Sequence, residues 1–259
     1  MTILNEVHFF SESLGMHTSM NVILPQRRLM NAQTRRKRKY RTLYLLHGYS
    51  DDYSAWLRWS SIERYVEGMN LAVVMPSAHL SFYTDMEHGG KYWQFISEEV
   101  PAVAQDMFPL SSKRADNFVA GLSMGGYGAF KLALTHPDRF AAAASLSGSL
   151  DIRDTVKGFG ETDAEAWLAS MRDIFGDLRK VPGSKHDLYR LAEKASRSTV
   201  RPSLYVCCGT DDPDYESNLN FCEQLRSLDF DLTFEDASGG HDWAFWDSMI
   251  PHVLAWLPG

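Results

Sequence analysis

The hexapeptide Gly121-Leu122-Ser123-Met124-Gly125-Gly126 constrains the fold of this chain more than any other stretch. It contains the pattern Gly-x-Ser-x-Gly, in which a serine occupies a sharp turn between a buried strand and a helix. An apolar run at 117–120 precedes it, and helix-forming residues at 127–134 follow it before His136-Pro137 ends the helix. We predict a strand, turn and helix that expose the Ser123 hydroxyl at a helix N-terminus, where developing negative charge is favoured. The alternative is a glycine-rich turn whose serine has no chemical role.

The alternation of apolar runs and helical stretches around this motif predicts an α/β-hydrolase fold. We expect a mostly parallel central sheet with helices on both faces. Extended runs at 7–10 and 18–24, separated by Leu14-Gly15, predict an antiparallel N-terminal hairpin. The chain has 259 residues, of which 44% are hydrophobic, so residues 1–259 are expected to form one domain. The polar segment 150–200 breaks the alternation and predicts a small cap or insertion over the site.

Other runs add predicted elements in chain order. Strands are expected at 41–46, 71–76, 140–148, 202–208 and 231–235. Helices are expected at 92–108 with Pro101 bending or restarting them, 163–174, 186–196, 215–228 and 243–257.

Charge and hydropathy exclude several classes of partner. The net charge of -7 disfavours nucleic acid or an anionic membrane as the main partner. Basic residues crowd 26–41, which we interpret as a solvated connection rather than a nucleic-acid patch. No run of eighteen apolar residues is present, so no membrane span is expected, and no signal peptide is visible at the N-terminus.

The three cysteines, Cys207, Cys208 and Cys222, are odd in number, and two of them are adjacent in an apolar run. Reduced thiols in a cytoplasmic protein fit this pattern best. No Cys/His spacing indicates a zinc site, so we expect neither a metal nor another cofactor. Self-association into a homo-oligomer stays open at this point.

A serine hydroxyl needs a base to become a nucleophile, and the base needs an orienting carboxylate. In α/β-hydrolases the chain order is Ser, then Asp or Glu, then His. Of the histidines in range after Ser123, His186 precedes the loop expected to carry the acid, and His252 lies within the last helix. His241 follows two glycines just past a strand and is therefore the predicted base.

The acid is expected in the loop after strand 202–208, which contains Asp211, Asp212 and Asp214. Position in the loop favours Asp212, and the other two remain alternatives. The acid would hold the imidazole tautomer and stabilise the imidazolium.

The strand at 41–46 runs into His47-Gly48, the second chemical signal. In this fold the loop after that strand donates one backbone N–H to the oxyanion hole, and the residue after the nucleophile donates another. We therefore nominate the N–H groups of Tyr49 and Met124, each donor being worth about 2.7–4 kcal/mol. Gly48 would let the backbone approach the substrate, and His47 is interpreted as structural.

The walls of the pocket are harder to predict. The loop 81–90 is polar, aromatic and rich in glycine, as is typical of a loop that lines a site. Trp56 and Trp59 recur at helical spacing, as in core packing, although either could wall the pocket. The predicted substrate-binding residues are Gly48, Trp56, Tyr83 and Trp243. The adjacent Glu98 and Glu99 are interpreted as a solvated helix face rather than an acid/base pair.

Several motifs together resemble the esterase D-like family, and most closely its small bacterial tributyrin-type carboxylesterases. The resemblance rests on 45–48, Trp56, 81–86, 121–126, 208–212 and 240–243. It implies an α/β-hydrolase fold and metal-free hydrolysis of short-acyl esters, acetyl to butyryl, through an acyl-enzyme. In that family the acid precedes a Phe-Leu-type pair. Asp212 takes the acid's place, although Pro213-Asp214 follows it here.

The same resemblance extends to the S-formylglutathione hydrolases, which share the 121–126 motif and the helix start at Glu98-Glu99. Their oxyanion loop reads Ser-Gly where this chain has His47-Gly48, so a carboxylesterase acting on small esters is the leading hypothesis and a thioesterase the alternative. Exported feruloyl esterases and mycolyltransferases would be expected to carry a signal peptide. A non-catalytic binding protein would not need Ser123, His241 and Asp212 together.

Overall fold

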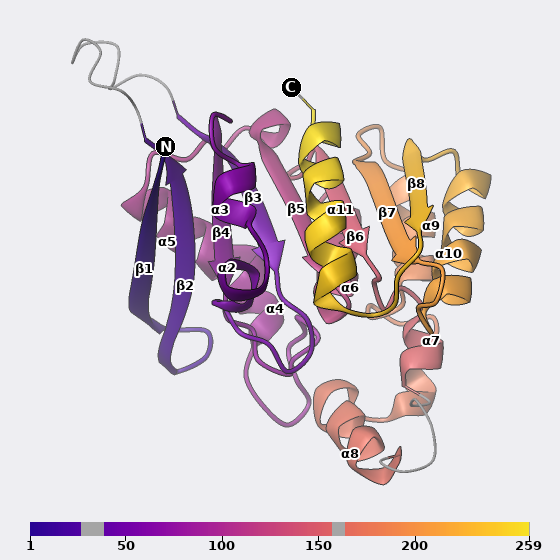
Figure 1. Ribbon diagram of the computed structural model, residues 1–259. Coiled ribbons are helices and arrows are strands. Elements are labelled where there is room, and N and C mark those ends of the chain that lie inside the picture. Colours follow the sequence, from indigo (N-terminus) through magenta and orange to yellow (C-terminus); the bar gives the residue numbers. More distant parts are fainter. Residues whose placement is uncertain (27–38, 157–163, 259) are drawn as a thin grey trace.

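A single mixed sheet runs through the computed structural model, which describes residues 1–26, 39–156 and 164–258. Within these residues eight strands lie in the order β1-β2-β4-β3-β5-β6-β7-β8 (Figure 1). They span Thr2–Ser11 (β1), Met16–Pro25 (β2), Arg41–Leu46 (β3), Leu71–Pro76 (β4), Asn117–Leu122 (β5), Ala142–Leu146 (β6), Ser203–Gly209 (β7) and Leu232–Ala237 (β8). Strands β3 to β8 pair in parallel, whereas β1 and β2 are antiparallel to their neighbours. The predicted α/β-hydrolase fold with an N-terminal hairpin is confirmed.

Helices cover both faces of this sheet, as predicted (Figure 1). The α-helices span Ala55–Trp59 (α2), Ile62–Tyr65 (α3), Tyr92–Gln94 (α4), Val100–Met107 (α5), Met124–Thr135 (α6), Ile152–Thr155 (α7), Ala164–Phe175 (α8), Leu188–Ser196 (α9), Tyr215–Ser227 (α10) and Trp243–Trp256 (α11). Short 3-10 helices lie at Arg114–Asp116 and Leu178–Lys180.

Alternation along the strands explains the two layers, because successive side chains of a strand point to opposite faces. In β3, Tyr44 and Leu46 pack in one core with α5, α6, α9 and α10. Leu43 and Leu45 pack in the second core with α2, α3 and α11. Both faces of the central strands are therefore buried, which is why these strands are mostly apolar on both faces.

The predicted helix over 92–108 forms, with an irregular centre. Residues Phe95–Glu99 are a π-helix between α4 and α5. Pro101 lacks the N–H that would bond Ser97 O in an α-helix, and Arg139 Nη2 donates to that oxygen at 2.6 Å instead. Glu98 is exposed as expected, whereas Glu99 is only partly exposed. Its carboxylate accepts hydrogen bonds from the hairpin loop at 11–13.

The polar segment between β6 and β7 contains the expected helices as α8 and α9. Helix α9 packs on α6, whereas α8 lies beyond the end of the sheet (Figure 1). That residues 150–200 form a cap, and that residues 1–259 form a single domain, are still predictions. Most of the basic stretch, residues 27–38, lies outside the described residues. None of the described helices is long and apolar enough to cross a bilayer.

Candidate active site

Ser123 occupies the predicted turn between β5 and α6. Its backbone is strained, with φ 51° and ψ -119°, a conformation that L-residues rarely adopt. Its N–H donates to Leu146 O at 2.9 Å, which ties the turn to β6. A Cβ atom at Gly125 would lie 2.5 Å from Leu46 O, and one at Gly121 would lie 2.4 Å from the Gly125 backbone. Glycine at both positions therefore lets α6 begin directly against the ends of β3 and β5.

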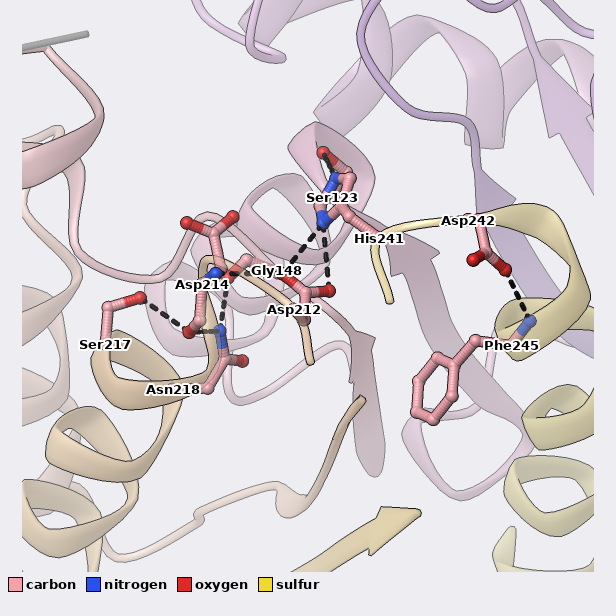
Figure 2. Close-up of polar contacts among 9 residues, drawn as sticks. All are labelled: Ser123, Gly148, Asp212, Asp214, Ser217, Asn218, His241, Asp242 and Phe245. Carbon is pink, nitrogen blue, oxygen red and sulfur yellow. Dashed lines mark hydrogen bonds and ion pairs between the residues drawn. The ribbon is translucent and has the colours of Figure 1, made fainter. Parts of the chain in front are cut away.

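His241 and Asp212 meet Ser123 at this turn, as Figure 2 shows. His241 lies in the loop between β8 and α11, and its Nε2 is 2.9 Å from Ser123 Oγ. Its Nδ1 is 3.0 and 3.1 Å from the two carboxylate oxygens of Asp212, in the loop between β7 and α10. A proton on Nδ1 donates to the carboxylate and leaves Nε2 free to accept the serine hydroxyl. This arrangement can remove the proton from Ser123 during attack on a carbonyl carbon.

The environment of Asp212 keeps it ionised. Its side chain is fully buried, and it also accepts the Asp214 N–H at 2.8 Å. Burial alone would raise the pKa of Asp212, but the bond and charge of His241 and the backbone N–H hold it below the ordinary value. Conversely, burial would lower the pKa of His241, and the Asp212 carboxylate raises it.

The alternative candidates for the acid and the base make other contacts. Asp211 is exposed, and the structure places Asp212 rather than Asp211 or Asp214 in hydrogen-bond contact with the imidazole. His252 Nδ1 contacts Glu235 at 2.7 Å. His186 Nδ1 lies near Thr84, 3.4 Å from its hydroxyl. Neither histidine is bonded to Ser123.

His47 holds the loop that carries the first nominated oxyanion donor. The Ala78 N–H donates to Nε2 at 2.8 Å, so the ring proton is on Nδ1, which donates to Gly48 O at 2.7 Å. Burial lowers the pKa of His47 to about 4 and keeps the ring neutral. The C=O and N–H of a trans peptide point in opposite directions, so this bond directs the Tyr49 N–H away from His47. The structural role predicted for His47 is confirmed.

Two further features fit the nominated oxyanion donors. Met124 is the first residue of α6, so its N–H has no partner within the helix. A Cβ atom at Gly48 would lie 3.7 Å from Ser123 Cβ, so the 48–49 loop borders the serine. The N–H groups of Tyr49 and Met124 remain predicted donors.

A cavity of about 580 Å³ opens in front of Ser123. Its walls include Gly48 and Trp243, two of the four predicted substrate-binding residues. The full lining is Gly48, Tyr49, Ser50, Asp51, Phe82, Leu122, Ser123, Ser149, Trp167, Pro213, Asp214, His241, Asp242, Trp243 and Trp246.

The other two residues predicted to contact the substrate, Trp56 and Tyr83, do not line the cavity, because both side chains are buried. Trp56 packs edge-on against Trp243 at 5.1 Å and donates to Leu46 O at 3.0 Å. The Tyr83 hydroxyl donates to His47 O at 2.9 Å. Both side chains pack behind residues that line the cavity. The loop at 81–90 contributes Phe82 to the lining instead.

Sequence reasoning missed several lining residues, chiefly Trp167, Trp246 and Asp214. Trp167 comes from α8, its ring 5.2 Å from that of Tyr49. The 163–174 helix was expected near the site, but helical periodicity does not say which side chain reaches a distant loop. The sequence nominates Asp214 only as an alternative acid.

A metal is not needed to explain the acidic cluster at the site. Donor atoms of Asp212, Asp214 and His241 lie within 4.8 Å of one another. Both ring nitrogens of His241 are already engaged, one by Ser123 and one by Asp212. The hydrogen-bonded array therefore accounts for this cluster, and Asp214 is left to be explained.

Comparison with known proteins agrees with this geometry. Residues 11–257 match a family model described as "Putative esterase". An acetyl esterase of Caldicellulosiruptor saccharolyticus is 32% identical over 262 residues, which cover 97% of each chain.

Two solved structures from Staphylococcus aureus share the architecture over nearly all residues. FphF, a fluorophosphonate-binding serine hydrolase, superposes with a TM-score of 0.90 at 38% identity and covers 99% of this chain and 98% of that one. An S-formylglutathione hydrolase, FrmB, superposes with a TM-score of 0.88 at 37% identity and covers 99% of both chains.

Proposed function

The chain belongs to this esterase family, and from that premise we propose that it is a serine carboxylesterase acting on short-acyl esters, acetyl to butyryl. The observation that carries the proposal is the continuous array from Ser123 Oγ through His241 to Asp212 on the wall of the cavity. A serine hydrolase of this kind needs no other group for its chemistry.

In the first half-reaction, Ser123 Oγ attacks the ester carbonyl carbon while His241 Nε2 takes the hydroxyl proton. The tetrahedral oxyanion accepts hydrogen bonds from the N–H groups of Tyr49 and Met124. The C–O bond to the alcohol then breaks, and His241 returns the proton to the leaving oxygen. Asp212 stabilises the imidazolium throughout. An acyl-Ser123 ester and a free alcohol result.

In the second half-reaction, water attacks the acyl carbon as His241 takes one of its protons. The intermediate collapses, Ser123 Oγ regains the proton, and the carboxylic acid leaves. Aromatic walls at Phe82, Trp167 and Trp246 narrow the space around the serine and support a preference for small acyl groups. The named acetyl esterase relative supports the same preference.

The proposed partner is a small ester rather than a macromolecule, because the candidate site is a cavity and not a flat surface. The three cysteines are buried and free of disulfides, which supports a location in the reducing cytoplasm.

The test is kcat/KM on p-nitrophenyl esters from acetyl to octanoyl. We expect activity to decline beyond butyryl and Ser123→Ala to lower kcat by about 10⁴-fold or more. Ser149→Ala is the matched control, because Ser149 also lines the cavity but its hydroxyl is not bonded to His241. Equal activity of the wild-type enzyme and Ser123→Ala would refute the mechanism.

A thioesterase acting on S-formylglutathione is the second candidate. The similarity to the S. aureus S-formylglutathione hydrolase supports it, whereas His47-Gly48 in the oxyanion loop disfavours it. The two are separated by kcat/KM on p-nitrophenyl acetate and on S-formylglutathione, and a strong preference for the thioester would replace the leading proposal.

A further inference from the structure

Asp214 places at the candidate active site a carboxylate that has no hydrogen-bond donor among the described residues. The residue is 8% exposed and lines the cavity. Its hydrogen bonds within the described residues are made by the backbone: the N–H donates to Asp212, and the carbonyl accepts from Ser217 and Asn218. In Figure 2 its carboxylate points away from α10, and no dashed line reaches it. The carboxylate therefore has acceptor capacity that residues 1–26, 39–156 and 164–258 leave unused.

The other acidic residues of the cavity differ in this respect. Asp242 accepts the Phe245 N–H at 3.0 Å and caps α11. Asp51 is only half-buried, and the Gly48 backbone opposes the rise that burial causes in its pKa. No lysine or arginine is among the described residues that line the cavity. His241 is thus the one lining side chain there that can become positive, and it is already paired with Asp212.

Within the described residues, the Asp214 carboxylate on the cavity wall has no protein donor and is hydrated only through the cavity, so a donor or positive charge on a bound ligand can compensate its partial desolvation. Burial, together with the negative charges of Asp212 and Asp154 and against the attraction of His241, raises the pKa of Asp214 to about 6. Above that pH the carboxylate is ionised. A positive group of a bound substrate would then supply the missing partner, while a substrate carboxylate would be repelled.

We propose that Asp214 is a specificity-determining residue that makes this site prefer esters bearing a positively charged group over neutral esters, and neutral over anionic ones. The inference rests on the proposed esterase function and narrows its substrate class. A cavity wall screens charge less than bulk water does, so one unpaired charge within several ångströms can change kcat/KM by about tenfold. The same rule disfavours glutathione thioesters, which carry two carboxylates and one ammonium.

The test uses acetylcholine and its neutral isostere 3,3-dimethylbutyl acetate, which differ in charge but hardly in shape. At pH 8 we expect a kcat/KM ratio of about ten in favour of the cation, falling to about one in Asp214→Asn. Asp211→Asn is the matched control, because it makes the same change on an exposed residue of the same loop. It should keep the wild-type ratio.

The pH profile of the wild-type ratio gives a second readout that needs no variant. Loss of the His241 base at low pH affects both esters equally and cancels in the ratio. The ratio should therefore fall towards one as the pH drops through about 6. Hydrolysis that depends on Ser123 but shows no preference for the cation, or a preference that survives in Asp214→Asn, would overturn this inference alone. Absence of Ser123-dependent hydrolysis of either ester would instead refute the esterase function.

Discussion

Replacing Lys131 by methionine should give a variant that is more stable than the wild-type protein at pH 6 and less stable at pH 10. Lys131 lies on α6 and is 4% exposed. Its Nζ donates to Tyr83 O at 3.2 Å and to the Thr84 hydroxyl, and lies 4.8 Å from the centre of the Trp93 ring. No carboxylate among the described residues forms an ion pair with it. Burial, and then the charge of Lys185, lower the pKa of Lys131 to about 7 from an ordinary value of 10.5.

The magnitude follows from proton linkage. Between pH 7 and 10.5 the unfolded chain keeps the Lys131 proton that the native protein has lost, so the wild-type free energy of unfolding rises with pH. The pKa difference corresponds to at most about 5 kcal/mol at 1.36 kcal/mol per pKa unit. Below pH 7 the native protein bears the whole cost of the buried ammonium, which methionine removes.

The substitution also leaves Tyr83 O and the Thr84 hydroxyl without their donor, at a cost of about 1–3 kcal/mol. We therefore expect Lys131→Met to be more stable than wild type by about 2–4 kcal/mol at pH 6. At pH 10 about 0.8 kcal/mol of the ammonium cost is still present, so the variant should be less stable than wild type by up to about 2 kcal/mol. Urea denaturation across this range measures the difference, provided that the m-values agree. The exposed Lys180→Met is the control and should give a flat difference. A difference for Lys131→Met that does not change with pH would refute the reasoning.

Three further predictions concern the candidate active site. Gly125→Ala should abolish most activity and lower the free energy of unfolding by about 2 kcal/mol or more, because the new Cβ would lie 2.5 Å from Leu46 O. Thermal melting and kcat/KM test the two effects, and full activity would contradict the packing described. Asp212→Asn should lower kcat by about 10⁴-fold by favouring the wrong imidazole tautomer, whereas Asp211→Asn should change it less than about threefold; equal losses in the two variants would reassign the acid. The kcat/KM for a neutral ester should rise with pH through a pKa above 6.5, because only neutral His241 accepts a proton and Asp212 raises the pKa of His241. Asp212→Asn should move this inflection to lower pH. An inflection that does not move would show that another group titrates.

Much of this fold is predictable from local pattern. The strands Arg41–Leu46 and Leu71–Pro76 have the expected bounds, because parallel strands buried on both faces are mostly apolar and polar residues flank them. The Gly-x-Ser-x-Gly turn and the chain order of the acid and base are equally local, so Ser123, Asp212 and His241 could be nominated without a structure.

The walls of the cavity were less predictable, because composition does not say which side of a loop faces a distant element. Trp56 and Tyr83 were expected at the substrate, yet they turn inward to bond Leu46 O and His47 O. Neighbouring Phe82 lines the cavity instead. Trp167 reaches the cavity from a helix whose position depends on tertiary packing. The Asp214 carboxylate has no hydrogen-bond donor in the part of the chain that the structure describes, and this too depends on how distant elements pack.

Mapping the acyl-enzyme tests the central claim most directly. The enzyme is mixed with p-nitrophenyl acetate, quenched in acid within the first turnover, digested and analysed by mass spectrometry. We expect one acetyl group on the peptide that contains Ser123, its accumulation in step with a burst of p-nitrophenol, and neither signal in Ser123→Ala. Acetylation of another residue during turnover, or a burst that persists in Ser123→Ala, would contradict the assignment of Ser123 as the nucleophile.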